Sequence, residues 1–183
     1  DLLTGSVNDP LPTFGTPTYN WHVVASTGQT IIDGTAQNFS FTPTDNGTFT
    51  VTYTVTDAAG NIGATTTAIA VGNVAPTVGI TETSTLRLEG TPVTFSSTVG
   101  DAGSADTATL AYLWSVTKDG NAYGVSGNTS PTFTFTPDDD ASYVVTLTVT
   151  DKDTAATSAS TTVPVADVAP TIKITSLTSS LNE

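Results

Sequence analysis

Two stretches of the chain alternate between apolar and polar residues, and only Val144 in the second breaks the alternation. Residues 49–55 read FTVTYTV, and residues 143–149 read YVVTLTV. A period of two places successive side chains on opposite faces of a β-strand. Threonine at the polar positions suits a strand and keeps its outer face soluble. Each stretch therefore predicts an antiparallel strand with one face toward a core and the other toward water.

These stretches belong to an internal repeat. Residues 39–61 match residues 133–155 at an offset of 94, and the linkers NVAPTV (from Asn73) and DVAPTI (from Asp167) keep that offset. A period near 94 is too long for a solenoid and is the size of one immunoglobulin-type sandwich. The predicted fold class is therefore all-β, with two tandem Ig-like antiparallel sandwiches.

The pattern also locates the other strands and the centre of each core. Trp21 and Trp114 correspond at an offset of 93, on what would be the third strand of each sandwich, where a tryptophan normally fills the core. His22 follows Trp21, so alternation places it on the wet face. No helical period extends over ten residues. In the second copy we expect strands near residues 77–86, 92–99, 110–117, 131–136, 142–150 and 156–165.

The two ends of the chain are complementary. Residues 2–7 align with residues 94–99, so the first copy starts at its second strand, and residues 171–183 match the first strand at 77–89. We expect a sandwich without its first strand at 1–73, a complete one at 74–168, and at 169–183 the first strand of a following repeat or a donor strand. Two interpretations stay open beside an arbitrary boundary: a covalent array, or subunits that donate tails to one another.

Composition narrows the classes of function. Seventeen acidic against four basic residues give a net charge of −13, which disfavours nucleic acids and anionic membranes as partners. The chain has no cysteine and one histidine, so thiol chemistry and histidine-rich metal centres are excluded. No apolar run approaches the length of a membrane span, about 18 residues. Paired aspartates could serve a glycosidase only in a deep cleft, which a thin sandwich with short loops lacks, so we expect no enzyme.

Most carboxylates map to the loops at the ends of the two sandwiches. Converging carboxylates repel one another unless a cation is present, and oxygen ligands without His or Cys favour Ca²⁺. Acidic loops that only confer solubility are the alternative. One expected group comprises Asp45, Asn73, Asp101, Asp151 and Asp153, joined by Glu183 of a neighbour. The other comprises Glu89, Asp138, Asp139, Asp140, Asp167, Asp9 and Asp57.

Several of these motifs resemble a known family. Glu89-Gly90, Trp114, FTFTP, YVVTLTVTDKD and the DVAPTI linker resemble the PKD-type and cadherin-like Ig-fold repeats of bacterial and archaeal surface proteins. The resemblance implies Ca²⁺ ligation by a Glu before the second strand, by acids of the following turn and by a linker Asx. In this chain those positions are Glu89, residues 138–140 and Asp167.

The expected function is structural. We expect an extracellular or cell-surface filament or stalk unit, joined head to tail to copies of itself and stiffened by Ca²⁺. Strand complementation or chain continuity would carry tension between units. The alternative is an accessory module of a larger secreted protein that binds a glycan or protein ligand. A row of exposed aromatic residues would favour that alternative, whereas most aromatics here alternate inward.

Overall fold

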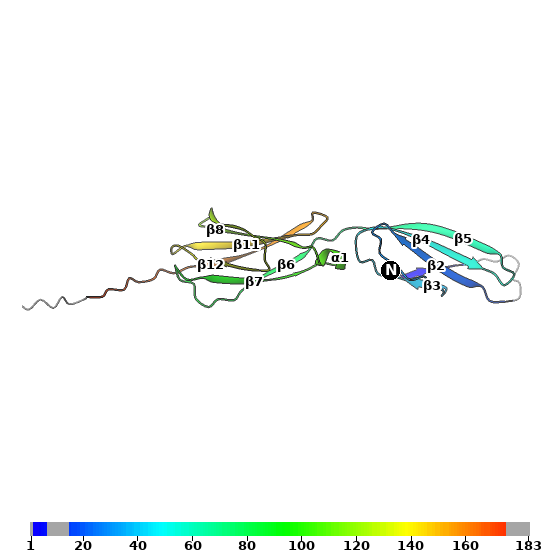
Figure 1. Ribbon diagram of the computed structural model, residues 1–183, viewed down its shortest axis with the longest axis horizontal. Coiled ribbons are helices and arrows are strands. Elements are labelled where there is room, and N and C mark those ends of the chain that lie inside the picture. The colour runs from blue at the N-terminus through cyan, green and yellow to red at the C-terminus, as the bar shows by residue number, and fades with distance from the viewer. Residues whose placement is uncertain (1, 7–14, 175–183) are drawn as a thin grey trace, which may run out of the picture. The chain divides into compact units, whose positions relative to one another are not determined.

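The computed structural model describes residues 2–6 and 15–174, and β-strands predominate along them (Figure 1). The first copy of the repeat contains β1 (Leu2–Thr4), β2 (Thr18–Ala25), β3 (Asn38–Ser40), β4 (Gly47–Thr56) and β5 (Ile62–Val71). The second copy contains β6 (Thr77–Glu82), β7 (Val93–Gly100), helix α1 (Ser104–Thr107), β8 (Ala111–Lys118), β9 (Asn121–Asn128), β10 (Thr132–Phe135), β11 (Ser142–Thr150) and β12 (Ala156–Pro164). Within the described chain no helix has the length and hydropathy of a membrane-spanning segment.

The first copy folds as two antiparallel sheets. One sheet has the order β2-β4-β5, and the other pairs β1 with β3. The register sets Trp21 of β2 opposite Tyr53 of β4, and Tyr53 opposite Thr65 of β5. Because opposite residues in an antiparallel pair point to the same face, the apolar positions of β2 and β4 gather on one side.

Aromatic rings form much of the first core. Trp21 stacks on Tyr53 with ring centroids 4.1 Å apart, and the indole Nε1 donates a hydrogen bond to the carbonyl oxygen of Ala36 at 3.0 Å. Val23, Phe49 and Val51 complete the buried set. The indole thus buries its apolar surface while its N–H keeps a partner, as a buried tryptophan requires.

The second copy adds two strands to this plan. Its sheets have the orders β10-β7-β6 and β12-β11-β8-β9. Trp114 has no exposed surface, and its Nε1 donates to the carbonyl oxygen of Ser130 at 2.9 Å, as Trp21 does to Ala36. The other buried hydrophobic residues here are Val93, Phe95, Val116, Phe133, Phe135, Tyr143, Val145, Leu147, Val149, Val163 and Val165.

The predictions of two Ig-like sandwiches and of buried Trp21 and Trp114 are confirmed. His22 lies exposed, beside Asp33, as alternation predicts. Two elements were not predicted: β9, whose sequence NAYGVSGN shows no alternation, and the four-residue helix α1. The strand expected at 77–86 ends at Glu82, after which Leu88 forms a parallel bridge to Ala166.

Proximity of Cα atoms divides the described chain into two compact units. The first takes its residues from 1–79, 99–112 and 148–158, and the second from 80–98, 113–147 and 159–183. The first unit therefore contains α1 and the turn between β11 and β12 in addition to strands β1–β5. The domain boundaries expected at residues 73 and 168 stay predictions.

Candidate cation sites in the acidic loops

Three carboxylates of the first compact unit converge on one point. Asp45 lies in the turn before β4, Asp106 lies in α1, and Asp153 lies in the turn after β11. One carboxylate oxygen from each lies within 4.8 Å of the others. The backbone helps to hold them, because the N–H of Ala105 donates to the carbonyl oxygen of Thr44 at 3.1 Å. Asp106 is only 1% exposed.

A lysine ammonium already lies among these carboxylates. Lys152 Nζ is 2.7 Å from Asp45 Oδ1 and 3.1 Å from Asp106 Oδ1, and it also pairs with Asp153. Hydrogen bonds to Asp153 and Asp45 raise the pKa of Lys152 above its ordinary value, so the ammonium stays charged. Three negative charges against one positive charge leave the cluster with a formal excess of two. The cluster therefore has an oxygen donor set and a charge that suit a divalent cation.

The structure places the other residues of this expected group differently. Asn73 Nδ2 donates to Asp151 Oδ2 at 2.7 Å, and Asp151 Oδ1 accepts from the N–H of Ala155 at 2.8 Å. The hydrogen bond from Asn73 lowers the pKa of Asp151. Asp101 Oδ1 accepts from the N–H of Gly103 at 2.8 Å. Asp45 and Asp153 thus come together as expected, while Asp101, Asp151 and Asn73 have partners of their own.

The carboxylate of Asp57 in the first copy accepts hydrogen bonds from the turn that follows it, as the carboxylate of Asp151 does. Its Oδ1 accepts from the N–H groups of Ala59 and Asn61 at 2.8 Å each, and its Oδ2 accepts from Asn61 Nδ2 at 2.7 Å. Both aspartates follow the last residue of a strand and satisfy the backbone of the next turn. Ligation of a metal by Asp57 or Asp151 stays a prediction.

A second group of carboxylates lies in the second compact unit. Oxygens of Glu89, Asp139 and Asp140 lie within 4.8 Å of one another, and Glu89 Oε1 accepts from the N–H of Val168 at 3.2 Å. Three of the expected residues thus gather, while Asp138 turns to other partners and Asp167 is exposed. Asp9 and Glu183 lie outside the described residues.

Asp138 and Asp139 both face a lysine. Lys118 Nζ lies 3.0 Å from Asp138 Oδ1 and 3.2 Å from Asp139 Oδ2. Its hydrogen bonds lower the pKa of both carboxyls, and the pKa of Lys118 rises in return. Tyr143 Oη also donates to Asp138 Oδ1, at 2.8 Å. This is the hydroxyl of a tyrosine corner, and Phe49 at the matching position of the first copy lacks it.

Sequence reasoning missed Asp106, Lys118 and Lys152 as members of these groups. Lys152 had a visible signal, because DKD at 151–153 stands where the first copy has DAA at 57–59. Asp106 had no comparable signal, since the short helix that carries it follows no periodic pattern.

Comparisons with known proteins agree with the fold. Residues 80–165 match the family model described as "K319L-like, PKD domain", so the expected resemblance to PKD-type repeats is confirmed over this part of the chain. No curated protein matches the chain.

Several solved structures are similar at low identity. Fibronectin(III)-like modules of Clostridium thermocellum CbhA share 16% identity over 88% of this chain and 83% of theirs, with a TM-score of 0.39. The amphioxus IgVJ-C2 molecule shares 12% over 90% of this chain and 95% of its own, with a TM-score of 0.45. Three N-terminal domains of the bacteriophage RB49 Hoc protein share 20% identity over 87% of this chain and 51% of theirs, with a TM-score of 0.37.

Proposed function

We propose that the chain is a non-catalytic structural unit of an extracellular or cell-surface stalk or filament. Units would follow one another head to tail, by chain continuity or strand complementation, and bound Ca²⁺ would stiffen the acidic loops. Ig-like and PKD-type domains serve as structural or binding modules of larger proteins, and the match at 80–165 supports the structural class. The exposed large hydrophobic side chains of the described surface are all aliphatic, so no aromatic binding row favours the alternative of a glycan-binding module.

The cluster of Asp45, Asp106 and Asp153 carries the Ca²⁺ part of this proposal. Burial of Asp106 makes its charge costly unless a cation lies beside it. Its Oδ1 has no hydrogen bond of good geometry among the described residues, although Lys152 Nζ lies 3.1 Å away. The lysine thus neutralises the cluster only in part, and Ca²⁺ could take more of the oxygens as ligands if the ammonium moved outward.

Calcium titration followed by melting temperature tests the proposal. We expect binding at roughly 10⁻⁴–10⁻³ M, as in other extracellular modules, and a melting temperature that rises with Ca²⁺ and falls with chelator. Asp106→Asn should abolish the response, whereas Lys152→Gln should strengthen it because the competing ammonium is gone. Asp33→Asn is the matched control, since that exposed carboxylate pairs with His22 away from the cluster. Equal melting temperatures with Ca²⁺ and with chelator would contradict Ca²⁺ binding.

Electron microscopy of native material tests the assembly. Each sandwich is built of strands about 5–10 residues long at about 3.3 Å per residue, plus loops, so two in series predict an axial repeat on the order of 80 Å. Dispersed particles without any axial repeat would contradict a stalk or filament.

A further inference from the structure

We infer that Asp101 is a further ligand of the divalent cation proposed for the cluster of Asp45, Asp106 and Asp153, and that the loop 101–106 forms the buried side of that site. The inference rests on the proposed function and deepens it, because it says which further groups hold the cation. The loop runs from the end of β7 into α1. It belongs to the first compact unit, as Asp45 and Asp153 do.

Buried polar atoms without a partner gather in this loop. Among the described residues, three buried side-chain atoms have no hydrogen bond: Tyr53 Oη, Asp101 Oδ2 and Asp106 Oδ1. Two of the three are therefore carboxylate oxygens of the same short loop. Removing a charged oxygen from water costs far more free energy than removing a neutral hydroxyl, unless an opposite charge lies beside it. The pair of carboxylates thus points to a cation as the partner.

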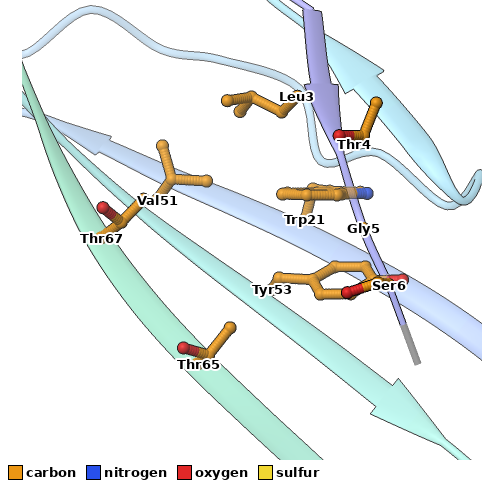
Figure 2. A pocket seen from close by; sticks show the side chains of 9 residues that line it. All are labelled: Leu3, Thr4, Gly5, Ser6, Trp21, Val51, Tyr53, Thr65 and Thr67. Carbon is orange, nitrogen blue, oxygen red and sulfur yellow. The ribbon is translucent and has the colours of Figure 1, made fainter. Parts of the chain in front are cut away.

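The Tyr53 hydroxyl has different surroundings. Tyr53 lines a pocket of about 250 Å³ beside β1, where Figure 2 shows the rings of Trp21 and Tyr53 next to the β1 segment. None of the residues that line this pocket is charged: Leu3, Thr4, Gly5, Ser6, Trp21, Val51, Tyr53, Thr65 and Thr67. A divalent cation takes carboxylate oxygens by preference, so this pocket is no cation site.

Two other aspartates that follow a strand show the purely structural use of such a carboxylate. Asp57 and Asp151 each accept hydrogen bonds at both of their oxygens. Asp101, which follows β7, accepts one at Oδ1, from the N–H of Gly103 at 2.8 Å. Its Oδ2 is buried and accepts none from the described residues. The turn therefore uses only one oxygen of Asp101, and the other is available to a cation.

Gly103 allows the carboxylates of Asp101 and Asp106 to approach one another. A Cβ built on Gly103 would lie 2.5 Å from Asp106 Oδ2 and 3.5 Å from Asp101 Oδ1. The carbonyl oxygen of Gly103 also accepts a hydrogen bond from the N–H of Asp106 at 3.1 Å. Both carboxylates thus flank the space that the glycine leaves free. Two negative charges held this close repel one another, and a bound cation offsets the repulsion.

A pocket gives the ion room beside the loop. It has a volume of about 290 Å³, and its polar lining includes Asp45, Asn73, Gly103 and Asp106. The cluster supplies one converging oxygen from each of three carboxylates. Because Ca²⁺ takes about six to eight oxygen ligands, it needs further oxygens from the protein and from water. Asp101 Oδ2 is a buried carboxylate oxygen of the adjoining loop that has no other partner.

Lys152 does not neutralise this side of the cluster. Its Nζ pairs with Asp45, Asp106 and Asp153, and in the described chain it forms no ion pair with Asp101. With Asp101 included, four carboxylates face one ammonium, which leaves a formal excess of three negative charges. That excess favours a divalent over a monovalent cation.

Calcium affinity of the full-length chain tests the role of Asp101. Asp101→Asn keeps an oxygen that can accept from Gly103 N–H but removes the charge, so the dissociation constant measured by isothermal titration calorimetry should rise about tenfold or more. Asp119→Asn is the matched control, because Asp119 Oδ1 also accepts a backbone N–H, from Ser142 at 3.1 Å, while the residue is exposed. That control should leave the affinity unchanged.

Stability in chelator separates a ligand from a residue that only holds its turn. A ligand without its cation contributes repulsion, so Asp101→Asn should not lower the melting temperature when Ca²⁺ is removed. The same substitution should reduce the rise in melting temperature that Ca²⁺ produces. A lower melting temperature in chelator with an unchanged Ca²⁺ response would overturn the inference, because Asp101 would then serve only the turn.

Gly103→Ala tests the geometry without removing a ligand. The φ of Gly103 is −81°, which any residue adopts, so the variant strains no backbone dihedral. Its methyl group would lie 2.5 Å from Asp106 Oδ2, so this carboxylate must move and Ca²⁺ affinity should fall. Gly63→Ala is the matched control, since a Cβ there meets nothing within 4 Å, and it should bind Ca²⁺ as the unsubstituted chain does.

The outcomes distinguish this inference from the proposed function. Absence of Ca²⁺ binding to the unsubstituted chain would overturn both. Binding that Asp106→Asn abolishes, while Asp101→Asn and Gly103→Ala leave it intact, would overturn the role of the loop and keep the proposed site. An equal loss of affinity in Asp101→Asn and Asp119→Asn would also overturn the inference, because it would reflect net charge alone.

Discussion

The two sandwiches have matching central strands but are closed to different degrees. Trp114 and Leu147 have no exposed surface, whereas Trp21 and Tyr53 at the matching positions are 5% and 7% exposed. The second sandwich has β6 beside β7 and β9 beside β8, whereas the first has a pocket at the corresponding edge. The cores are thus built by the same alternation, and the difference lies in the strands at the edges.

Forming a core and covering the edge of that core are separate requirements of this fold. Alternation in β4 and β11 is enough to form a core around one tryptophan. Sealing that core needs a further strand, whose apolar residues cover the edge of the sandwich. Among the described residues the edge beside β1 has no such strand, so an added strand of the same pattern is expected to stabilise the first sandwich.

The largest expected effect comes from removing the two tryptophans. Trp114→Ala should cost about 3–5 kcal/mol of unfolding free energy, because the enclosed site cannot collapse fully. Trp21→Ala should cost less, about 2–3 kcal/mol, since its site already borders an open pocket. Urea unfolding followed by circular dichroism measures both. An equal or larger cost at Trp21 would show that the first core is as closed as the second.

The next largest effect is expected at Tyr143, where loss of the hydroxyl should lower stability more than it does at Tyr53. Tyr143→Phe removes a hydrogen bond to the Asp138 carboxylate and should cost about 1.5–3 kcal/mol, the usual range for a bond to a charged group. Tyr53→Phe removes a hydroxyl without a partner in the described chain, so in dilute solution it should change stability by no more than about 0.5 kcal/mol. A large loss at Tyr53 in dilute monomer would mean that its hydroxyl already has a partner.

Acid should destabilise both sandwiches, because an aspartate holds the turn that follows β4 and another holds the turn that follows β11. Hydrogen bonds from Asn61 and from Asn73 lower the pKa of Asp57 and of Asp151 below the ordinary value of 3.8. A carboxyl whose pKa is lower in the folded state stabilises the fold above its unfolded pKa. That contribution is lost as the pH falls below 3.8 and through the folded pKa. Melting temperatures between pH 5 and pH 2 should therefore fall less steeply in Asp57→Asn and Asp151→Asn, and an unchanged slope would contradict the role of these turns.

Much of the fold could be predicted because the strands are regular. The alternation at 49–55 and 143–149, the 94-residue offset and the two tryptophans were enough for the sandwich fold. Strand β9 was not predicted, because its sequence NAYGVSGN contains two glycines and lacks a regular alternation of apolar and polar residues. Its place depends on pairing with β8 through an irregular register, a tertiary effect that local sequence does not carry.

The acidic sites could be predicted only as loops, not as sets of ligands. Asp45 and Asp153 were expected to meet and do, and Glu89 gathers with Asp139 and Asp140. Asp57 and Asp151 were indistinguishable from ligands in the sequence, yet their oxygens accept hydrogen bonds from their own turns. Asp106 could not be placed, since its position depends on how α1 packs beside the turn that carries Asp45.

Single-tryptophan unfolding, with a synthetic peptide of residues 171–183, tests most directly whether a strand completes the first sandwich. Trp114→Phe leaves Trp21 to report on the first sandwich, and Trp21→Phe leaves Trp114 to report on the second. Peptide that binds only the folded state at 100 times its dissociation constant should stabilise the first sandwich by about 2.7 kcal/mol. The Trp21 transition should therefore move to higher urea while the Trp114 transition stays in place. A Trp21 transition that does not move, or two transitions that move equally, would contradict the expectation that an added strand covers the open edge of the first sandwich.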